Sequence, residues 1–312
     1  MPTERQQVST QMDVSFFEAF QLPFMMRAFL TVAVLAVAAG VVGLGISFRE
    51  MEFVSDGLVH AVFPGLVIGA MIGGTAGLLP GALGAALVAA LVFTLLDRRG
   101  GAGSDAAIAV GLTGLFSLGI VLVSKQQGFV AQLQDLLFGH LLTVTEDQLW
   151  QILVVAILAI AVMLLTGRAQ LFRAFDPVGF EAAGFKILRT DLALAAATAL
   201  LVVAGVQALG VLMVVALLTV PMAVARLVTK KIAWLVPIAV LVPLVAGTFG
   251  LWLSFVWSVE YEVSVSPGAL VVLLLVALYL VAVVFRLLVV RRGRVGSVHL
   301  DKLDEQETAG LA

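Results

Sequence analysis

The sequence contains no cysteine, and few of its residues carry charge. Zero Cys among 312 residues excludes disulfide-stapled secreted folds and removes thiolate as a metal ligand or nucleophile. Charged residues make up 12% of the chain and hydrophobic residues 62%, whereas soluble domains are roughly one quarter charged and one half apolar. A water-soluble fold has no interior large enough to bury this much apolar surface. The composition therefore predicts an integral membrane protein.

Motifs for nucleotide binding and hydrolysis are also missing. The chain has no G-x-x-x-x-G-K-[ST] sequence, so it cannot hold ATP phosphates with the usual phosphate loop. It has neither H-E-x-x-H nor G-x-S-x-G, which leaves little support for a membrane hydrolase. We expect a non-catalytic protein with no permanently bound cofactor and no nucleic-acid partner. Membrane lipid is the one partner that composition alone predicts.

The apolar residues fall in runs of about 20, the length that a helix needs to cross about 30 Å of hydrocarbon. These runs predict an all-α, polytopic fold with nine spans, at 24–47, 54–74, 76–96, 105–124, 148–167, 188–206, 209–228, 233–255 and 266–290. The weakest division lies within 192–225, where no charge interrupts the run. A broken or re-entrant span there would reduce the number of spans to eight.

Outside the spans the sequence predicts two polar tails. We expect an N-terminal tail over 1–22, a membrane domain over 23–292 and a C-terminal tail over 293–312. Phe16, Phe17 and Phe20 fit a short amphipathic helix on the membrane surface, and they fit an irregular extension equally well.

Positive charge is distributed unequally between the two sides of the predicted spans. Of the 18 Lys and Arg residues, one side holds only Arg5, Arg27 and Lys125. Cytoplasmic loops carry the excess of Lys and Arg, so the charge-rich side, which includes 97–104, 168–187 and the C-terminus, is predicted to be cytoplasmic. With nine spans the N-terminus is then outside. A plasma membrane is the expected location.

One predicted span carries a pair of polar side chains near its start. Asp56 and His60 are four residues apart, which places both on one face of a helix. Ionisable groups in a span are costly and usually face a cavity, a partner or an ion. A carboxylate with an imidazole suits Zn²⁺, Mn²⁺ or Fe²⁺. Pro64, one turn further on, is expected to kink the helix.

Structural explanations compete with this metal-site hypothesis. Asp56 lies about one turn from a charged loop and could simply be a solvated N-cap. Asp105 opens the fourth predicted span after a Gly-rich stretch, so it is a candidate third ligand, although N-capping is the more ordinary role.

The longest predicted cytoplasmic loop has the signals of a short helix. Asp176 can cap free amides, Pro177 suits the first helical position and Gly184 is a good terminator. A helix of about two turns is too short to be stable alone. It therefore needs a surface to pack on, either a partner protein or the membrane.

Several segments, in order, resemble the permease subunits of bacterial manganese, zinc and iron(II) ABC importers, the ABC-3 group. The segment 55–65 resembles the family's G-D-A-L-S-H-A-V-L-P-G. Further matches follow at Ser104 to Gly111, at Leu137 to Leu142 (L-F-G-x-x-L), at Phe175 to Gly184 (F-D-P-E-x-A-x-x-x-G) and at Gly210 to Pro221 (G-x-L-L-V-x-A-L-L-x-x-P). Five co-linear matches are far more specific than any one of them.

This resemblance implies a permease of the type II kind, like the importers of vitamin B12 and siderophores. It implies a homodimer around a central path, two copies of a cytoplasmic ATPase that uses ATP, and an extracytoplasmic metal-binding protein. The transported divalent ion would meet Asp56, His60 and, less securely, Asp105. The residues expected to couple to the ATPase are Phe175, Asp176, Pro177, Glu181, Ala182 and Gly184, and Pro221 is a second expected kink.

The sequence departs from the family pattern at a few positions and leaves rival functions open. Gly57 and Val59 replace the usual Ala and Ser, while Val178 and Phe180 replace the usual Glu and Ala. A secondary metal transporter would need no ATPase, but its typical internal repeat is not visible. A membrane enzyme using Asp56 and His60 as acid and base would need further polar groups at the same depth. The choice among zinc, manganese and iron stays open.

Overall fold

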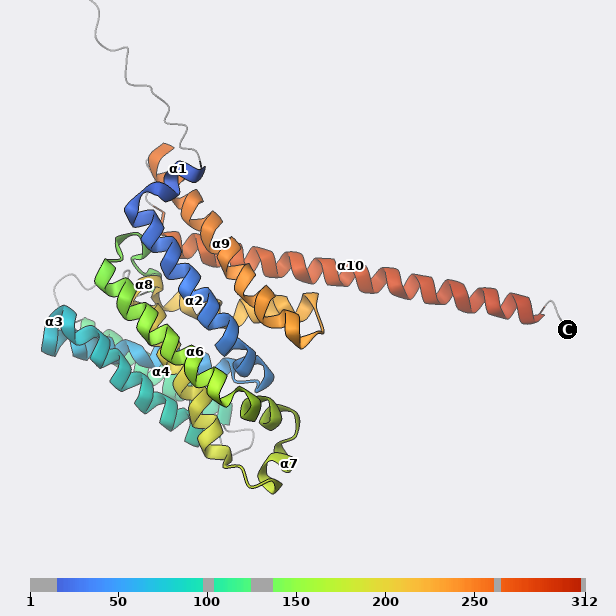
Figure 1. Cartoon of the computed structure of the whole chain (residues 1–312), viewed down its shortest axis with the longest axis horizontal. Coiled ribbons are helices and arrows are strands. Elements are labelled where there is room, and N and C mark those ends of the chain that lie inside the picture. Colours follow the sequence, from blue (N-terminus) through green and yellow to red (C-terminus); the bar gives the residue numbers. More distant parts are fainter. Residues whose placement is uncertain (1–15, 98–103, 125–136, 261–264, 310–312) are drawn as a thin grey trace, which may run out of the picture.

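The computed structural model describes residues 16–97, 104–124, 137–260 and 265–309, and within these ranges the chain is helical and contains no strand (Figure 1). The predicted all-α class is confirmed. The elements, in chain order, are α1 (Phe16–Gln21), α2 (Pro23–Phe48), α3 (Glu52–Asp97), α4 (Ser104–Val123), η1 (Leu141–Thr143), α6 (Glu146–Phe175), α7 (Pro177–Ala182), α8 (Ile187–Val228), α9 (Ile232–Glu260) and α10 (Pro267–Ala309).

Within the described residues, eight helical stretches are long and apolar enough to cross a membrane. They are α2, the two arms of α3, α4, α6, α8, α9 and the first part of α10, Pro267–Leu288. The chain is therefore a multi-pass membrane protein. The predicted spans 188–206 and 209–228 correspond to the two parts of α8 on either side of Gly210, where the backbone leaves helical geometry, and α8 is counted once among the eight stretches.

Glycine produces the break in α3. Gly74 has φ 59° and ψ −140°, outside helical geometry, and it divides α3 into the arms Glu52–Gly74 and Ala76–Asp97. The two arms pack backbone against backbone at Gly69 and Gly77. A Cβ on either glycine would overlap the backbone of the other. Small residues permit this close approach of membrane helices.

A second glycine bends α8. Gly210 has φ 78° and ψ 163°. A straight helix of 42 residues would be about 63 Å long, yet both ends of α8 reach the same end of α2. Asp191 near its start bonds to Arg49, and Arg226 near its end bonds to Ser47. The helix therefore folds into two arms that meet at Gly210.

Pro64 and Pro221, the two predicted kink positions, lie inside α3 and α8. The backbone leaves helical geometry at Gly74 and Gly210, while the kinks at the two prolines stay predictions. A glycine can adopt a positive φ without a Cβ clash, so it permits a sharper change of direction than a proline, whose ring fixes φ near −65°.

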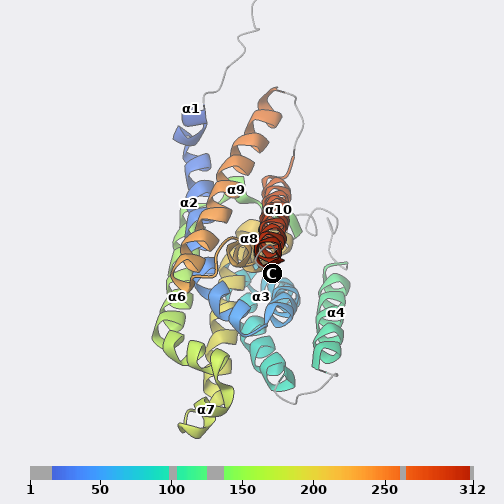
Figure 2. The ribbon, with the colours of Figure 1, turned by 90° about the vertical axis from the view of Figure 1, so that its right-hand side faces the viewer.

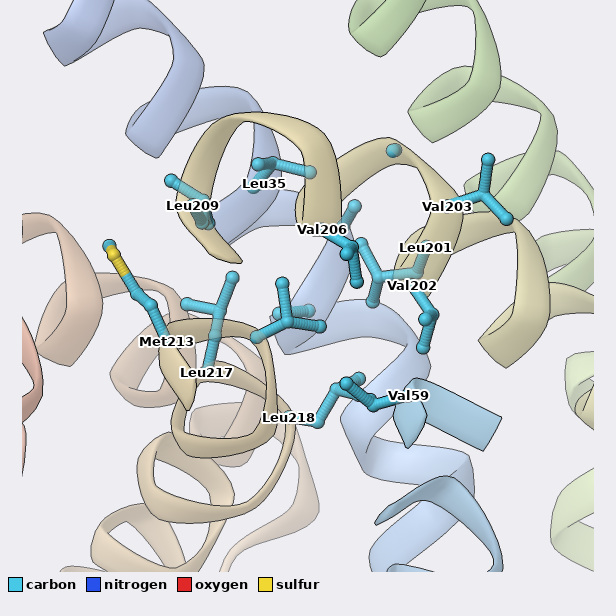
Figure 3. Close-up of a cluster of buried hydrophobic side chains, with 14 of the residues drawn as sticks. Leu35, Val59, Leu201, Val202, Val203, Val206, Leu209, Met213, Leu217 and Leu218 are labelled. Atoms are coloured by element: carbon cyan, nitrogen blue, oxygen red, sulfur yellow. The ribbon is translucent and has the colours of Figure 1, made fainter. Parts of the chain in front are cut away.

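The two arms of α8 form the centre of the molecule. Leu35 of α2 and Val59 of α3 belong to the same buried cluster as Val206 and Leu217 of α8 (Figure 3). Such packing gives many small dispersion contacts, which replace the hydrophobic effect as the force between helices in a lipid environment. The core thus holds the start of α3, which carries Asp56 and His60, against α8.

The two ends of the chain differ in how they meet the bundle. The short helix α1 packs near the start of α2, with the rings of Phe20 and Phe29 5.8 Å apart. The helix α10 continues through Ala309 and extends well beyond the other helices (Figure 1). Of the two predicted tails, residues 1–15 and 310–312 lie outside the described residues.

Candidate metal site and coupling helix

Asp56 and His60 lie together on the first arm of α3. His60 Nδ1 is 3.5 Å from Asp56 Oδ1 and 3.0 Å from the Asp56 carbonyl oxygen. A hydrogen on Nδ1 would donate to that carbonyl and leave the lone pair on Nε2 available. Backbone contacts of this kind commonly orient a metal-binding imidazole. The carboxylate and Nε2 are then the two groups of this pair that a metal could use.

The surroundings of the pair are apolar but not closed. Phe116 of α4 meets the His60 ring edge-on, with ring centroids 5.3 Å apart. The side chains of His60 and Asp56 keep 21% and 32% of their surface exposed. An apolar cavity of about 480 Å³ begins beside Ala61 and Pro64, between the arms of α3 and α4. This chain alone therefore covers the pair only in part.

The third candidate ligand, Asp105, is exposed in the first turn of α4. Among the described residues, no group of three or more His, Cys, Asp or Glu side chains is arranged to hold a metal. The structure therefore brings together two of the three predicted ligands. Asp105 stays a prediction.

The predicted loop helix is present as α7. Asp176 Oδ1 accepts a 2.8 Å hydrogen bond from the Gly179 amide, Pro177 is the first helical residue, and Gly184 follows the helix with φ 83°. Each capping signal read from the sequence therefore has its expected geometry. Glu181 and Ala182 are exposed, and so are Phe175 and Val178.

Phe180 anchors α7 to the bundle. In the sequence it stood out only as a departure from the family pattern. Phe180 is fully buried, stacks on Phe185 with ring centroids 4.9 Å apart, and meets Phe172 of α6 edge-on at 5.4 Å. Aromatic pairs of this geometry contribute beyond the area that they bury. They give the short helix the packing surface that it needs within its own chain.

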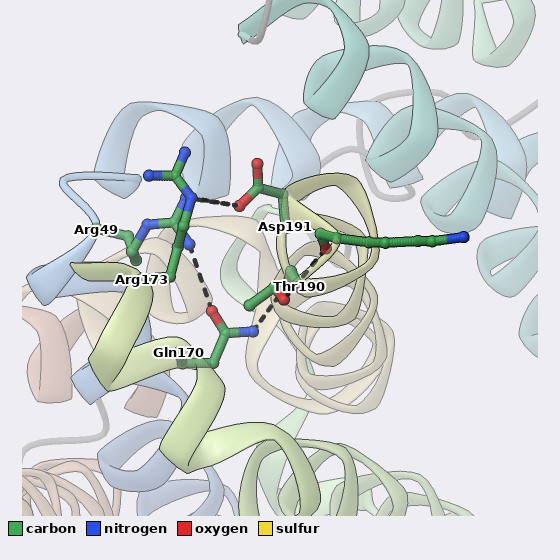
Figure 4. A network of polar contacts seen from close by, with 6 residues as sticks. Arg49, Gln170, Arg173, Thr190 and Asp191 are labelled. Atoms are coloured by element: carbon green, nitrogen blue, oxygen red, sulfur yellow. Dashed lines mark hydrogen bonds and ion pairs between the residues drawn. The ribbon is translucent and has the colours of Figure 1, made fainter. Parts of the chain in front are cut away.

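Figure 4 shows a cluster of polar side chains, at the ends of α2, α6 and α8, that the sequence did not lead us to predict. Arg49 Nη2 is 2.6 Å from Asp191 Oδ1, and their side chains are only 9% and 6% exposed. Gln170 Nε2 donates to the Thr190 carbonyl at 2.7 Å, and Arg173 Nε lies 3.9 Å from Asp191. The signal was available, because Asp191 is a lone carboxylate within the predicted span 188–206 and requires a partner in an apolar setting.

Comparison with known proteins identifies the family of this chain. The model of the ABC 3 transport family matches residues 21–286. This chain belongs to the ABC 3 transport family. The match includes α3 with its Asp56 and His60, the short helix α7 and both arms of α8, so the family suggested by the sequence motifs is confirmed.

Members of the family with related sequences are named for metal transport. The manganese transport system membrane protein MntC of Listeria monocytogenes is 29% identical over 265 residues, which cover 85% of this chain and 91% of that protein. The chelated iron transport system membrane protein YfeD of Yersinia pestis is 26% identical, with 86% and 87% covered.

Solved structures share the fold. PsaBC from Streptococcus pneumoniae, solved in complex with Fab, superposes with a TM-score of 0.74 at 25% identity and covers 86% of this chain and 94% of that chain. A proposed metal-chelate type ABC transporter in an inward-facing conformation gives a TM-score of 0.66 at 17% identity, with 90% and 92% covered, and shows the fold alone. The predicted permease fold is confirmed.

Proposed function

We propose that this chain is the permease subunit of an ATP-driven importer of divalent transition metal ions. The observation that carries the proposal is the Asp56 and His60 pair, 3.5 Å apart on a membrane-spanning helix of an ABC 3 family member. Two ligands from one chain do not make a closed four-ligand site. That suits transport, because a permeating ion has to leave the site again.

The proposed cargo is Mn²⁺ or Fe²⁺, with Zn²⁺ as the third possibility raised by the ligand types. Relatives named for manganese and for chelated iron support the first two. The chemistry of the pair suits all three ions, since imidazole nitrogen and carboxylate oxygen both bind borderline divalent metals. We therefore propose one path that meets the metal through Asp56 and His60, with water or another chain supplying further ligands.

The energy for transport is proposed to come from a separate ATPase. The sequence has no phosphate loop of its own. The helix α7 offers a docking surface, since Glu181 and Ala182 are exposed while Phe180 anchors the helix to α6. Two ATPase copies, one for each permease chain, would move α7 as they bind and hydrolyse ATP.

We propose a plasma-membrane orientation with α7 and the C-terminus in the cytoplasm. Arg49, Arg173 and Arg226 lie at the end of the bundle near α7, whereas Arg27 approaches Glu146 at the opposite end, where their side chains are 3.9 Å apart. The excess of positive charge near α7 supports a cytoplasmic location for that end. A metal-loaded binding protein would then dock at the Arg27 end.

A homodimer is proposed to form the complete path. Only 17% of the most apolar stretch of α4 is buried, the smallest share among the eight spans, and α4 lies at the edge of the bundle beside α3 (Figure 2). It also supplies Phe116, which contacts His60. A second copy packed near α4 would enclose the metal pair and could contribute the missing ligands.

The direct test is metal uptake by proteoliposomes that contain this chain and its ATPase. We expect accumulation of ⁵⁴Mn²⁺ or ⁵⁵Fe²⁺ that requires ATP on the cytoplasmic face and stops with an inactive ATPase. Uptake that proceeds equally without ATP would instead identify a secondary transporter.

A variant of the docking surface tests the role of α7. Ala182→Glu places a charge on the exposed face of α7 and is expected to reduce co-purification of the ATPase and to abolish uptake. Ser258→Glu adds the same charge at the exposed end of α9, away from α7 and α4, and serves as the matched control. Normal ATPase yield and normal uptake with Ala182→Glu would remove the docking proposal.

A further inference from the structure

The buried network around Arg49 joins three helix ends that border α7. Gln170 and Arg173 lie in the last turns of α6, directly before α7, and Asp191 lies in the first turns of α8, directly after it. Arg49, at the end of α2, bonds to Asp191 at 2.6 Å and approaches Gln170 Oε1 at 3.5 Å. Both chain segments that lead into α7 are thus tied to α2 (Figure 4).

Burial makes this connection stiff. Removing one partner of a buried ion pair is strongly destabilising, because the other charge stays uncompensated. With their side chains 9% and 6% exposed, Arg49 and Asp191 are in this regime. The ends of α2, α6 and α8 are therefore expected to move together rather than slide past one another.

A second set of contacts holds the same end of α2. The ring of Phe48 lies 5.5 Å from that of Phe175 on α6, and the Arg226 guanidinium carbon lies 5.8 Å from the Phe48 ring centroid. Arg226 also donates to Ser47 Oγ at 2.8 Å and to the Ser47 carbonyl at 3.1 Å. The end of α2 therefore contacts both arms of α8 and the end of α6.

The linker between this junction and the helix that carries the metal pair is short and constrained. Only Arg49, Glu50 and Met51 separate α2 from α3, and Glu50 takes a positive φ of 52°. The Met51 amide bonds back to the Ile46 carbonyl at 3.0 Å. Asp56 follows within the second turn of α3, so a rotation of the end of α2 is passed directly to the helix that carries the pair.

We infer that Arg49 is a positioning residue that couples α7 to the metal pair, with the Arg49–Asp191 ion pair as the joint. The inference rests on the proposed function. When an ATPase displaces α7, the joined ends of α6 and α8 carry the end of α2 with them. The tight turn at Glu50 then reorients Asp56 and His60, and the path changes its accessibility.

The test measures metal transported per ATP hydrolysed in proteoliposomes. In Arg49→Gln and in Asp191→Asn we expect hydrolysis to continue while this ratio falls about tenfold, within the usual range of coupling between two sites. The charge-swapped double variant, Arg49→Asp with Asp191→Arg, is expected to recover part of the ratio. Arg168→Gln changes an exposed arginine of α6 and is expected to leave the ratio unchanged.

A structural role would give a different result. If the single variants lose uptake and hydrolysis in proportion, or keep both, the coupling role is wrong. If the single variants do not assemble, Arg173→Gln carries the test, because Arg173 lies at the rim of the network with its side chain 20% exposed. Its ratio is expected to fall by a smaller factor, and an unchanged ratio would overturn the inference. A wild-type complex that hydrolyses ATP without moving metal contradicts the proposed function itself.

Discussion

Gly139 and Gly210, each with a positive φ, bring the segment before η1 into backbone contact with the bend of α8. Their φ angles are 72° and 78°, and a Cβ on either residue would overlap the backbone of the other segment. The His140 amide donates to the Ala208 carbonyl at 3.1 Å beside this contact. The bend of the central helix is therefore held by a loop from a distant part of the chain.

Gly210→Ala is expected to destabilise the protein more than an ordinary glycine replacement. A side chain at a positive φ costs about 1–3 kcal/mol, and the added Cβ would also overlap the backbone around Gly139. Thermal unfolding in detergent should show a transition several degrees lower. Gly114→Ala, on α4 with open space around the new Cβ, is the control and should change stability by no more than about 1 kcal/mol. Equal effects of both variants would contradict the strained bend.

Phe180→Ala should release α7 from the bundle. A buried Phe→Ala change costs about 3–5 kcal/mol, and Phe180 provides the ring contacts to Phe172 and Phe185. Faster amide hydrogen exchange over α7 is the expected readout, together with weaker ATPase binding. Val178→Ala, at a side chain 78% exposed on the same helix, should leave the exchange rate of α7 unchanged. Unchanged protection in Phe180→Ala would show that the aromatic cluster does not anchor α7.

His60→Ala should abolish metal uptake, because it removes the imidazole nitrogen proposed as a ligand. Asp56→Asn should reduce uptake strongly, because it removes the negative charge of the proposed carboxylate ligand. Initial uptake rates in vesicles at matched expression provide the measurement.

Co-purification with the ATPase distinguishes a metal-ligand role of Asp56 and His60 from a purely structural role. Neither residue lies in α7, so both variants should co-purify with the ATPase at the wild-type yield. Wild-type uptake rates for both variants at matched expression would show that the pair only supports the packing of α3.

The proposed topology can be tested with single cysteines, since the chain has none of its own. A cysteine at Ser297 should resist an impermeant reagent in intact cells and react after lysis. A cysteine at Asp147, exposed near the start of α6, should react in intact cells and is the matched control. Labelling of the Ser297 position in intact cells would contradict the proposed cytoplasmic location of the C-terminus.

Local signals predicted several features well. Runs of about 20 apolar residues can satisfy their backbone hydrogen bonds only within a helix, so the spans could be read directly. The caps of α7 were equally readable, because Asp176 and Pro177 act on their neighbours within one turn. The pairing of Asp56 with His60 followed from helix periodicity alone.

The sequence by itself determined the membrane class, the helical elements and the candidate metal pair, because each depends on residues within about one or two turns of one another. Only the tertiary structure decided that α8 reverses at Gly210 and that Asp191 pairs with Arg49, which is 142 residues away in the chain. No local pattern specifies such a partner. It is chosen by the burial of a charge that must find its counterion wherever the packed helices place one.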